Sequence, residues 1–310
     1  MRAWVRESYG GPGVLRLEER PDPVAGPGEL LVRVHASTVN RTDLAYLTGR
    51  PWVNRAVCGW PRPRAWARVL GSEYAGVVEA VGPGVTSYAV GDRVCGFADG
   101  RPGAHAERVV VAADSLVARL PGGWSFAGAA PAMEGAHYAL AMPRVARTRP
   151  GDRVLILGAT GAIGSALVQL LVADDVAVTA VSDQPLPDAL RELPVTEEVA
   201  GPYDVVADAA GKSSFAACRH LLAPRGTYVS SDLGRGGVNL LLAAAHPRVR
   251  FPVPKAGPEV ATEIAGRMAA GSYRPLIDRT YAFDELPAAY AYVATGRKVG
   301  NVVVTHDAAS

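Results

Sequence analysis

The spacing of apolar residues changes character about 120 residues into the chain. In the first part, short apolar runs end at turns that contain Gly or Pro. These runs are LLVRVHAST (30–38), GVVEAVGPGV (76–85), YAVGDRVCGF (88–97) and HAERVVVAA (105–113). Short strands separated by such turns are typical of an all-β, barrel-like unit. We therefore predict a barrel-like unit over 1–120.

After residue 125, apolar strands alternate with helical segments. FAGAAPAMEGAHYALAM (126–142) and AIGSALVQLLVA (162–173) have helical patterns. The predicted strands are RVLIL (153–157), VAVTAVS (176–182), YDVVADAAG (203–211) and GTYVSSDL (226–233). This alternation predicts βαβ units and a parallel sheet. The tail, 275–305, returns to strand, helix and strand.

Composition and charge exclude several classes of protein. The chain is 49% hydrophobic and 20% charged, which excludes a disordered chain. Its net charge of +2 argues against a nucleic-acid or membrane partner. Cys58, Cys95 and Cys218 form neither a disulfide framework nor a CxxC pair. The opening MRAWVRESYG lacks an apolar signal core, so we expect a cytoplasmic protein.

A glycine-rich turn follows the strand at 153–157. Gly158, Gly161 and Gly164 lie in GATGAIG, directly before an apolar helix. Such a turn allows backbone N–H groups to approach a pyrophosphate, and the helix amino end attracts its negative charge. The same glycines also fit a simple close-packed helix start. Their position inside a βαβ unit favours a dinucleotide site. They also divide the uncharged stretch 154–173 into strand, turn and helix, which argues against a membrane span.

The end of the next strand carries mixed signals for the nucleotide. Ser182 can donate to the 2′-phosphate of NADP, whereas Asp183 would repel that phosphate if it points inward. Asp183 can equally face solvent. From these residues alone, NADPH and NADH both stay open.

Several motifs, in this order, resemble one family over nearly the whole chain. They are VNRTD (39–43), GSEYAGVVEAVGPGV (71–85), YAVGDRVCGF, GATGAIGSALVQL, YDVVADAAGKSSF, YRPLIDRTYAFDEL and GRKVGNVVV. The chain resembles the medium-chain dehydrogenase/reductase superfamily, in its zinc-free, quinone-oxidoreductase-like and enoyl-reductase-like branch.

The resemblance implies an α/β protein with two domains. A GroES-like β-barrel catalytic domain would comprise 1–120 and 275–310, and a Rossmann domain with a doubly wound parallel sheet would comprise 121–274. It further implies a homodimer and NADPH-dependent reduction of a small quinone or an activated C=C bond. The segment after Ser182 departs from the family, because it is short and lacks the basic residues that usually hold the 2′-phosphate, so NADH is not excluded. The cofactor-binding residues implied are Gly158, Thr160, Gly161, Ala162, Ile163, Gly164, Ser182, Tyr138 and Asn301.

The resemblance also implies which residues of this chain stand at the zinc-ligand positions of its relatives. Zinc-dependent relatives have a Cys where this chain has Asn40 and a His where it has Ser72. Glu73 remains, but one carboxylate does not hold zinc. We therefore expect no zinc and no other metal.

Without a metal, hydrogen-bond donors must stabilise the oxyanion that forms when hydride reaches the substrate. Asn40 and Tyr46 are the candidate catalytic residues, and the Tyr46 phenol can also donate a proton. Tyr46 also fits a simpler role as a ring packed on a helix. Asp43 is expected to cap a helix or to stabilise a turn.

Two further regions bear on the substrate. Tyr138 falls where relatives often carry Thr near the nicotinamide, and His137 beside it could assist protonation or be purely structural. The segment 50–68 carries Arg62, Arg64 and Trp52 and no acidic residue. Arg and Trp together can bind a flat anionic aromatic substrate, such as a polyketide-type enone. A solvated basic loop explains the same residues.

Three other functions stay open. The first is reduction of a ketone to an alcohol. The second is binding of a nucleotide or another ligand without turnover, which the altered adenosine end favours. The third is catalysis without redox chemistry, such as cyclisation on the same scaffold.

Overall fold

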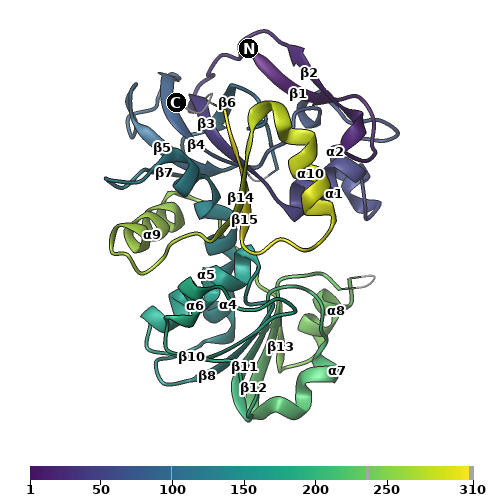
Figure 1. Cartoon of the computed structure of the whole chain (residues 1–310), viewed down its shortest axis with the longest axis vertical. Coiled ribbons are helices and arrows are strands. Elements are labelled where there is room, and N and C mark those ends of the chain that lie inside the picture. The colour runs from purple at the N-terminus through teal and green to yellow at the C-terminus, as the bar shows by residue number, and fades with distance from the viewer. Residues whose placement is uncertain (99, 235–236, 307–310) are drawn as a thin grey trace. The chain divides into compact units, whose positions relative to one another are not determined.

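A computed structural model of the chain describes residues 1–98, 100–234 and 237–306, which form two compact units (Figure 1). Unit 1 comprises Met1–Met133, Ala256–Ala269 and the chain from Ile277 onward. Unit 2 comprises Glu134–Lys255 and Ala270–Leu276.

Unit 1 is built on a seven-stranded sheet. Its strands are β3 (Glu29–Val39), β4 (Glu73–Val81), β5 (Arg93–Phe97), β6 (Arg108–Ala112), β7 (Leu116–Arg119), β14 (Ile277–Ala282) and β15 (Asn301–Thr305). They pair in the order β14-β15-β3-β4-β5-β7, and β6 pairs with β3. The long β3 strand joins three neighbours, because β6 pairs with its first half and β15 with its last residues. β1 (Arg2–Arg6) and β2 (Leu15–Glu19) form a separate antiparallel pair.

Short helices surround this sheet. They are α1 (Arg41–Thr48), α2 (Val53–Cys58), α3 (Phe126–Ala129), α9 (Pro258–Ala269) and α10 (Leu286–Ala294), with 3-10 turns η1 (Pro12–Val14), η2 (Ala65–Ala67), η3 (Ala130–Ala132) and η6 (Phe283–Glu285). Residues 121–133 belong to unit 1 because α3 and η3 pack on β3 and β4. α9 belongs to it because this helix packs on β7. The compact units therefore divide the chain at different residues from the predicted domains.

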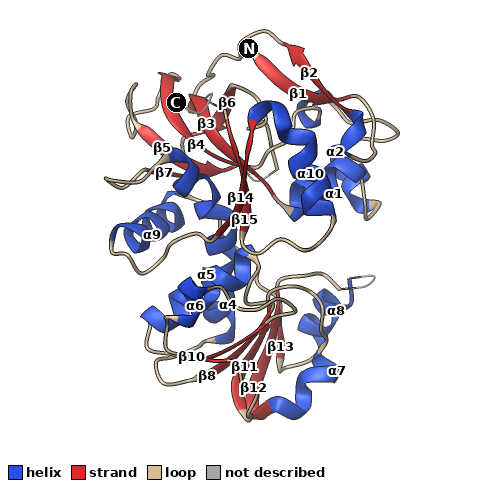
Figure 2. Ribbon diagram, in the orientation of Figure 1, coloured by secondary structure: helices blue, strands red, loops and turns tan. Residues whose placement is uncertain are grey.

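Unit 2 is a parallel sheet with helices on both faces (Figure 2). Its strands are β8 (Arg153–Leu157), β9 (Ala177–Val181), β10 (Val195–Thr196), β11 (Tyr203–Asp208), β12 (Leu222–Ser230) and β13 (Val249–Arg250). Its helices are α4 (Met133–Ala146), α5 (Ala162–Ala173), α6 (Asp188–Arg191), α7 (Phe215–Cys218) and α8 (Val238–Ala245), with the 3-10 turn η4 (Arg219–Leu221). The order β10-β9-β8-β11-β12-β13 is 3-2-1-4-5-6 in chain order. This is the doubly wound Rossmann order, whose ligands bind where the strand order reverses.

The predicted fold class is confirmed, with a GroES-like part and a parallel Rossmann-like sheet. The uncharged stretch 154–173 divides into β8, the glycine turn and α5, as predicted. The helices α2, α6, α7, α8 and α9 were not predicted, and α2 lies in a segment for which a loop was one interpretation. Across the described ranges of the chain, no helix is both long and apolar enough to span a membrane.

Candidate functional site

The glycine turn requires glycine at two of its positions. Gly158 has a φ of +82°, a conformation that other residues rarely adopt, and a Cβ there would lie 2.5 Å from the Ala210 Cβ. A Cβ on Gly164 would lie 2.1 Å from the Gly158 carbonyl oxygen. These distances allow no side chain, so the turn holds β8, α5 and the loop after β11 in close contact.

The amino end of α5 fits an anionic group. No side chain in the described part of the chain caps this helix, whose N-cap residue is Gly161. The N–H groups of the first turn, at Ala162 and Ile163, therefore lack partners within the helix. A Cβ on Gly161 would meet nothing closer than an oxygen at 3.4 Å, so the backbone there is open to a ligand. Uncapped N–H groups beside small residues are the chemistry that a dinucleotide pyrophosphate needs.

The end of β9 is bound to the glycine turn. The Gly158 and Ala159 N–H groups donate to the Val181 carbonyl oxygen at 2.8 and 3.0 Å. The Thr160 and Ser182 hydroxyl oxygens are 2.5 Å apart and share a hydrogen bond. The structure thus brings Thr160 and Ser182, both predicted as cofactor-binding residues, into direct contact.

Asp183 is paired with a residue that the sequence analysis missed. The Lys212 ammonium group donates to the Asp183 carboxylate. Lys212 lies in the loop after β11 and is 29 positions from Asp183 in the chain. The only sequence signal for it was its place after YDVVADAAG, because parallel strands end at a common edge of the sheet.

The loop that carries Lys212 is organised by Asp208. This buried carboxylate accepts hydrogen bonds from the N–H groups of Gly211 at 2.8 Å and Ser213 at 2.9 Å, and more weakly from Ala210 and Lys212. The Tyr228 hydroxyl donates to it at 3.1 Å. Burial and the Asp208 carboxylate together raise the pKa of Tyr228, so this phenol stays protonated and remains a donor.

His137 and Tyr138 lie side by side on α4. Their rings are 5.7 Å apart in an edge-to-face arrangement. His137 Nε2 lies 3.0 Å from the Lys255 carbonyl oxygen, and because a carbonyl only accepts, this nitrogen carries a proton. The hydrogen bond gives His137 a structural role within unit 2, and a structural role was one of the two interpretations of this residue. Its predicted role in protonation stays a prediction.

In unit 1, Asn40 and Asp43 form the capping box of α1. The Asp43 N–H donates to Asn40 Oδ1 at 2.8 Å, and the Asn40 N–H donates to Asp43 Oδ2 at 3.2 Å. Asp43 also accepts from the Gly71 N–H at 3.2 Å. Asp43 is therefore a capping residue, as expected.

Two of the positions at which zinc-dependent relatives place ligands are joined by a hydrogen bond. Asn40 Nδ2 donates to Ser72 Oγ at 2.8 Å. Buried Glu73 accepts from Thr38 Oγ1 at 3.0 Å and from the Met133 N–H at 3.1 Å. Among residues 1–98, 100–234 and 237–306, no group of three His, Cys, Asp or Glu side chains is arranged to hold a metal.

Tyr46 lies in the last turn of α1 and packs against a core cluster that includes Leu47 and Tyr290. It is six positions after Asn40, which corresponds to about 9 Å along a helix axis. Asn40 and Tyr46 thus lie at opposite ends of α1, and their joint catalytic role stays a prediction. Fully buried Arg6 donates to the Tyr46 and Ala67 carbonyl oxygens and so fixes the end of α1. Asn301 is the buried first residue of β15, and its role toward a cofactor stays a prediction.

The segment 50–68 contains a helix and exposed aromatic side chains. Trp52 is 75% exposed and Trp60 is 70% exposed, and Arg62 and Arg64 are also exposed. Arg55 lies over the Trp60 ring at 5.3 Å and over the ring of Tyr9 at 4.8 Å. The segment thus presents an exposed surface of Arg and Trp around a short helix, and both interpretations of it stay predictions.

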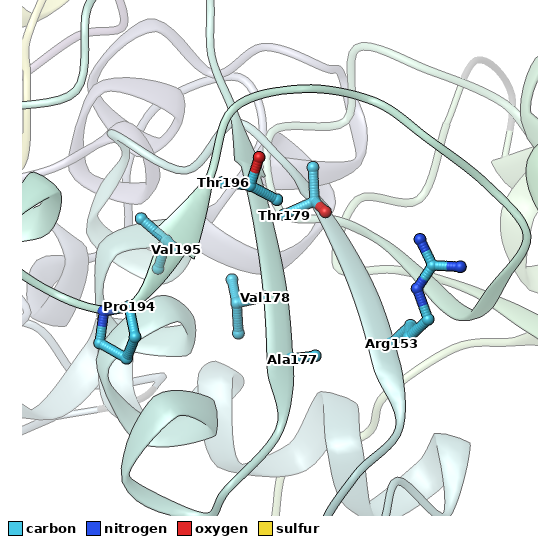
Figure 3. A pocket seen from close by; sticks show the side chains of 7 residues that line it. All are labelled: Arg153, Ala177, Val178, Thr179, Pro194, Val195 and Thr196. Carbon is cyan, nitrogen blue, oxygen red and sulfur yellow. The ribbon is translucent and has the colours of Figure 1, made fainter.

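A shallow pocket of about 350 Å³ lies beside β9 and β10 of the unit 2 sheet, and none of its lining residues belongs to the glycine turn (Figure 3). Arg153 and Ala177, which line it, are the first residues of β8 and β9, whereas the glycine turn follows the last residue of β8. The Arg153 guanidinium donates to the carbonyl oxygens of Ala200 and Pro202. The pocket is therefore separate from the predicted dinucleotide site.

Comparisons with known proteins agree with this architecture. Residues 26–122 match the alcohol dehydrogenase GroES-like domain, and 175–304 match the zinc-binding dehydrogenase domain. The quinone oxidoreductase of Pseudomonas aeruginosa is 31% identical over 96% of this chain and 97% of its own. The pikromycin polyketide synthase component PikAII of Streptomyces venezuelae is 32% identical over 92% of this chain, which spans 8% of that synthase.

Several solved structures are similar to this chain over almost its full length. Mycobacterial Rv1454c in complex with NADPH is 27% identical with a TM-score of 0.80, covering 99% of this chain and 100% of its own. A cobalt- and zinc-bound alcohol dehydrogenase from Pyrobaculum aerophilum is 26% identical with a TM-score of 0.80, covering 99% of both chains. The chain belongs to the medium-chain dehydrogenase/reductase superfamily and, within it, is quinone-oxidoreductase-like.

Proposed function

We propose that this protein is an NADPH-dependent, zinc-independent reductase of an activated C=C bond or a quinone. The observation that carries the proposal is the uncapped amino end of α5, next to the glycine turn at the point where the strand order reverses. Such a site takes a dinucleotide pyrophosphate. The NADPH complex of a relative with the same fold supports the choice of nucleotide.

The residues of unit 1 support chemistry without zinc. An amide and a hydroxyl at Asn40 and Ser72 are weaker zinc ligands than thiolate and imidazole, and here they bond to each other. When bound, NADPH supplies a hydride. The chain's own residues would stabilise the resulting oxygen charge on the substrate: the second Asn40 Nδ2 proton is a candidate donor, and Tyr46 is a candidate proton donor.

The substrate proposed is an enone or quinone with a bulky, aromatic, anionic part. The Arg and Trp side chains of 50–68 provide cations beside exposed rings. The likeness to polyketide synthases supports a polyketide-type enone. The cytoplasmic location and the homodimer stay predictions.

The first experiment is a titration of the protein with NADPH and with NADH, followed by nicotinamide fluorescence. We expect saturable binding of NADPH, and NADPH oxidation when quinones or α,β-unsaturated ketones are added, with the C=C bond reduced in the enone product. Absence of binding would overturn the proposal. Binding without oxidation of NADPH would indicate a binding protein, reduction of the carbonyl would indicate a ketone reductase, and turnover without nucleotide would indicate catalysis without redox chemistry.

A further inference from the structure

Asp183 and Lys212 form an ion pair at the carboxyl edge of the unit 2 sheet, next to Ser182. An acidic side chain at the end of the second strand favours NADH, because it accepts from the ribose 2′-hydroxyl and repels a 2′-phosphate. Here the positive charge of Lys212 compensates the negative charge of Asp183. The ion pair therefore removes the main electrostatic obstacle to a 2′-phosphate.

The position of Lys212 does not depend on this ion pair alone. Its side chain is 63% exposed and that of Asp183 is 69% exposed, and such surface pairs contribute little to folding stability. The backbone around Lys212 is instead fixed by Asp208, whose carboxylate accepts from four successive N–H groups. Gly211 has a φ of +67°, and a Cβ there would lie 2.4 Å from the Asp232 Cβ. A buried network thus holds an exposed lysine at the sheet edge where a nucleotide would bind.

The neighbouring hydroxyl pair adds a further donor. Thr160 and Ser182 share one hydrogen bond, which uses one of their two hydroxyl protons. The other proton is available to an acceptor at the same edge. One ammonium group and one free hydroxyl proton are donors suited to a phosphate monoester.

We propose that Lys212 sets the nucleotide preference of this chain, by compensating Asp183 and pairing with the 2′-phosphate of NADPH. The inference rests on the proposed function and assigns one part of its cofactor site. Lys212 would supply the positive charge from the loop after β11 rather than from the segment that directly follows Ser182.

The test compares Lys212→Ala with the wild-type protein in titrations with NADPH, NADH, 2′,5′-ADP and 5′-AMP. Loss of one charge-assisted hydrogen bond should weaken NADPH and 2′,5′-ADP roughly tenfold and leave NADH and 5′-AMP unchanged. Asp183→Asn should shift the preference in the opposite direction, with tighter NADPH and weaker NADH. Arg225→Ala is the matched control, because it removes an exposed charge near the start of β12, away from the glycine turn.

The outcomes separate this inference from the proposed function. If Lys212→Ala weakens NADPH and NADH by the same factor, Lys212 only maintains the loop and the inference is overturned. If Lys212→Ala binds NADPH as tightly as the wild-type protein does, the inference is overturned as well. In both cases the proposed function stands as long as the wild-type protein binds and oxidises NADPH. If the wild-type protein binds neither nucleotide, both fail.

Discussion

His105 has no exposed surface and lies between two hydrogen-bond partners that define its protonation state. Nε2 is 2.9 Å from the Thr38 carbonyl oxygen and Nδ1 is 3.3 Å from the Tyr290 hydroxyl. Because the carbonyl only accepts, Nε2 carries the proton and Nδ1 accepts from Tyr290. Burial lowers the pKa of His105 to about 4, and burial likewise lowers the pKa of His306.

This burial makes the stability of unit 1 depend on pH. The folded state keeps His105 neutral, whereas the unfolded chain binds a proton below its ordinary pKa of about 6.5. The stabilisation is therefore complete above pH 6.5 and decreases as the pH falls toward 4, by about 3 kcal/mol from this residue. Chemical denaturation at a series of pH values measures the decrease.

His105→Gln is the informative variant, since Gln can still donate to Thr38 but does not titrate. We expect its unfolding free energy to fall less steeply between pH 6.5 and 4 than that of the wild type. Exposed His220 provides the control, and His220→Gln should keep the wild-type profile. Identical profiles for His105→Gln and wild type would show that another group causes the acid sensitivity.

Tyr46 is the residue at which the proposed proton transfer can be tested. Tyr46→Phe keeps the ring in the core and removes the hydroxyl, so kcat for an enone should fall about 10²-fold or more while NADPH binding is unchanged. Tyr281→Phe is the control, because Tyr281 is a partly buried tyrosine that packs against the same core cluster. An unchanged kcat would leave Tyr46 with a packing role alone.

Among the helices, the features that depend on residues close in the sequence were the ones that could be predicted. The helix over 162–173 was predicted with the bounds that α5 has, because glycines mark its start and a continuous apolar run marks its length. Capping by Asp43 was predictable for the same reason, as its partner Asn40 is three residues away. α2 was missed because its six residues, Val53–Cys58, are too few to show a helical period.

The segment that contains α2 carries its own prediction. Replacing both Arg62 and Arg64 by Ala should raise KM about threefold or more for an acceptor with a carboxylate or phenolate, since each exposed charge contributes modestly. KM for a neutral quinone and kcat should not change. Arg101→Ala removes an exposed charge elsewhere in unit 1 and should have no effect. Equal KM values in the double variant and wild type would exclude this surface from substrate binding.

At the scale of the molecule, the sequence predicted the class of fold but not every contact between distant segments. The alternation of strands and helices predicted a parallel sheet, and the family resemblance predicted its doubly wound order, which the structure confirms. Lys212 could not be found in this way, because its meeting with Asp183 depends on how β9 and β11 end in space. Nor do neighbouring residues reveal that Asn40 bonds to Ser72.

The loop from Asp208 to Ser213 has a consequence for the thermodynamics of binding. Ordering a flexible loop costs on the order of 1–2 kcal/mol of conformational entropy per residue. Here the Asp208 carboxylate and the Tyr228 hydroxyl order the loop as the chain folds. A ligand that arrives at this edge meets a surface already in place. The affinity of the ligand therefore reflects the contacts that it makes, because binding costs little conformational entropy in this loop.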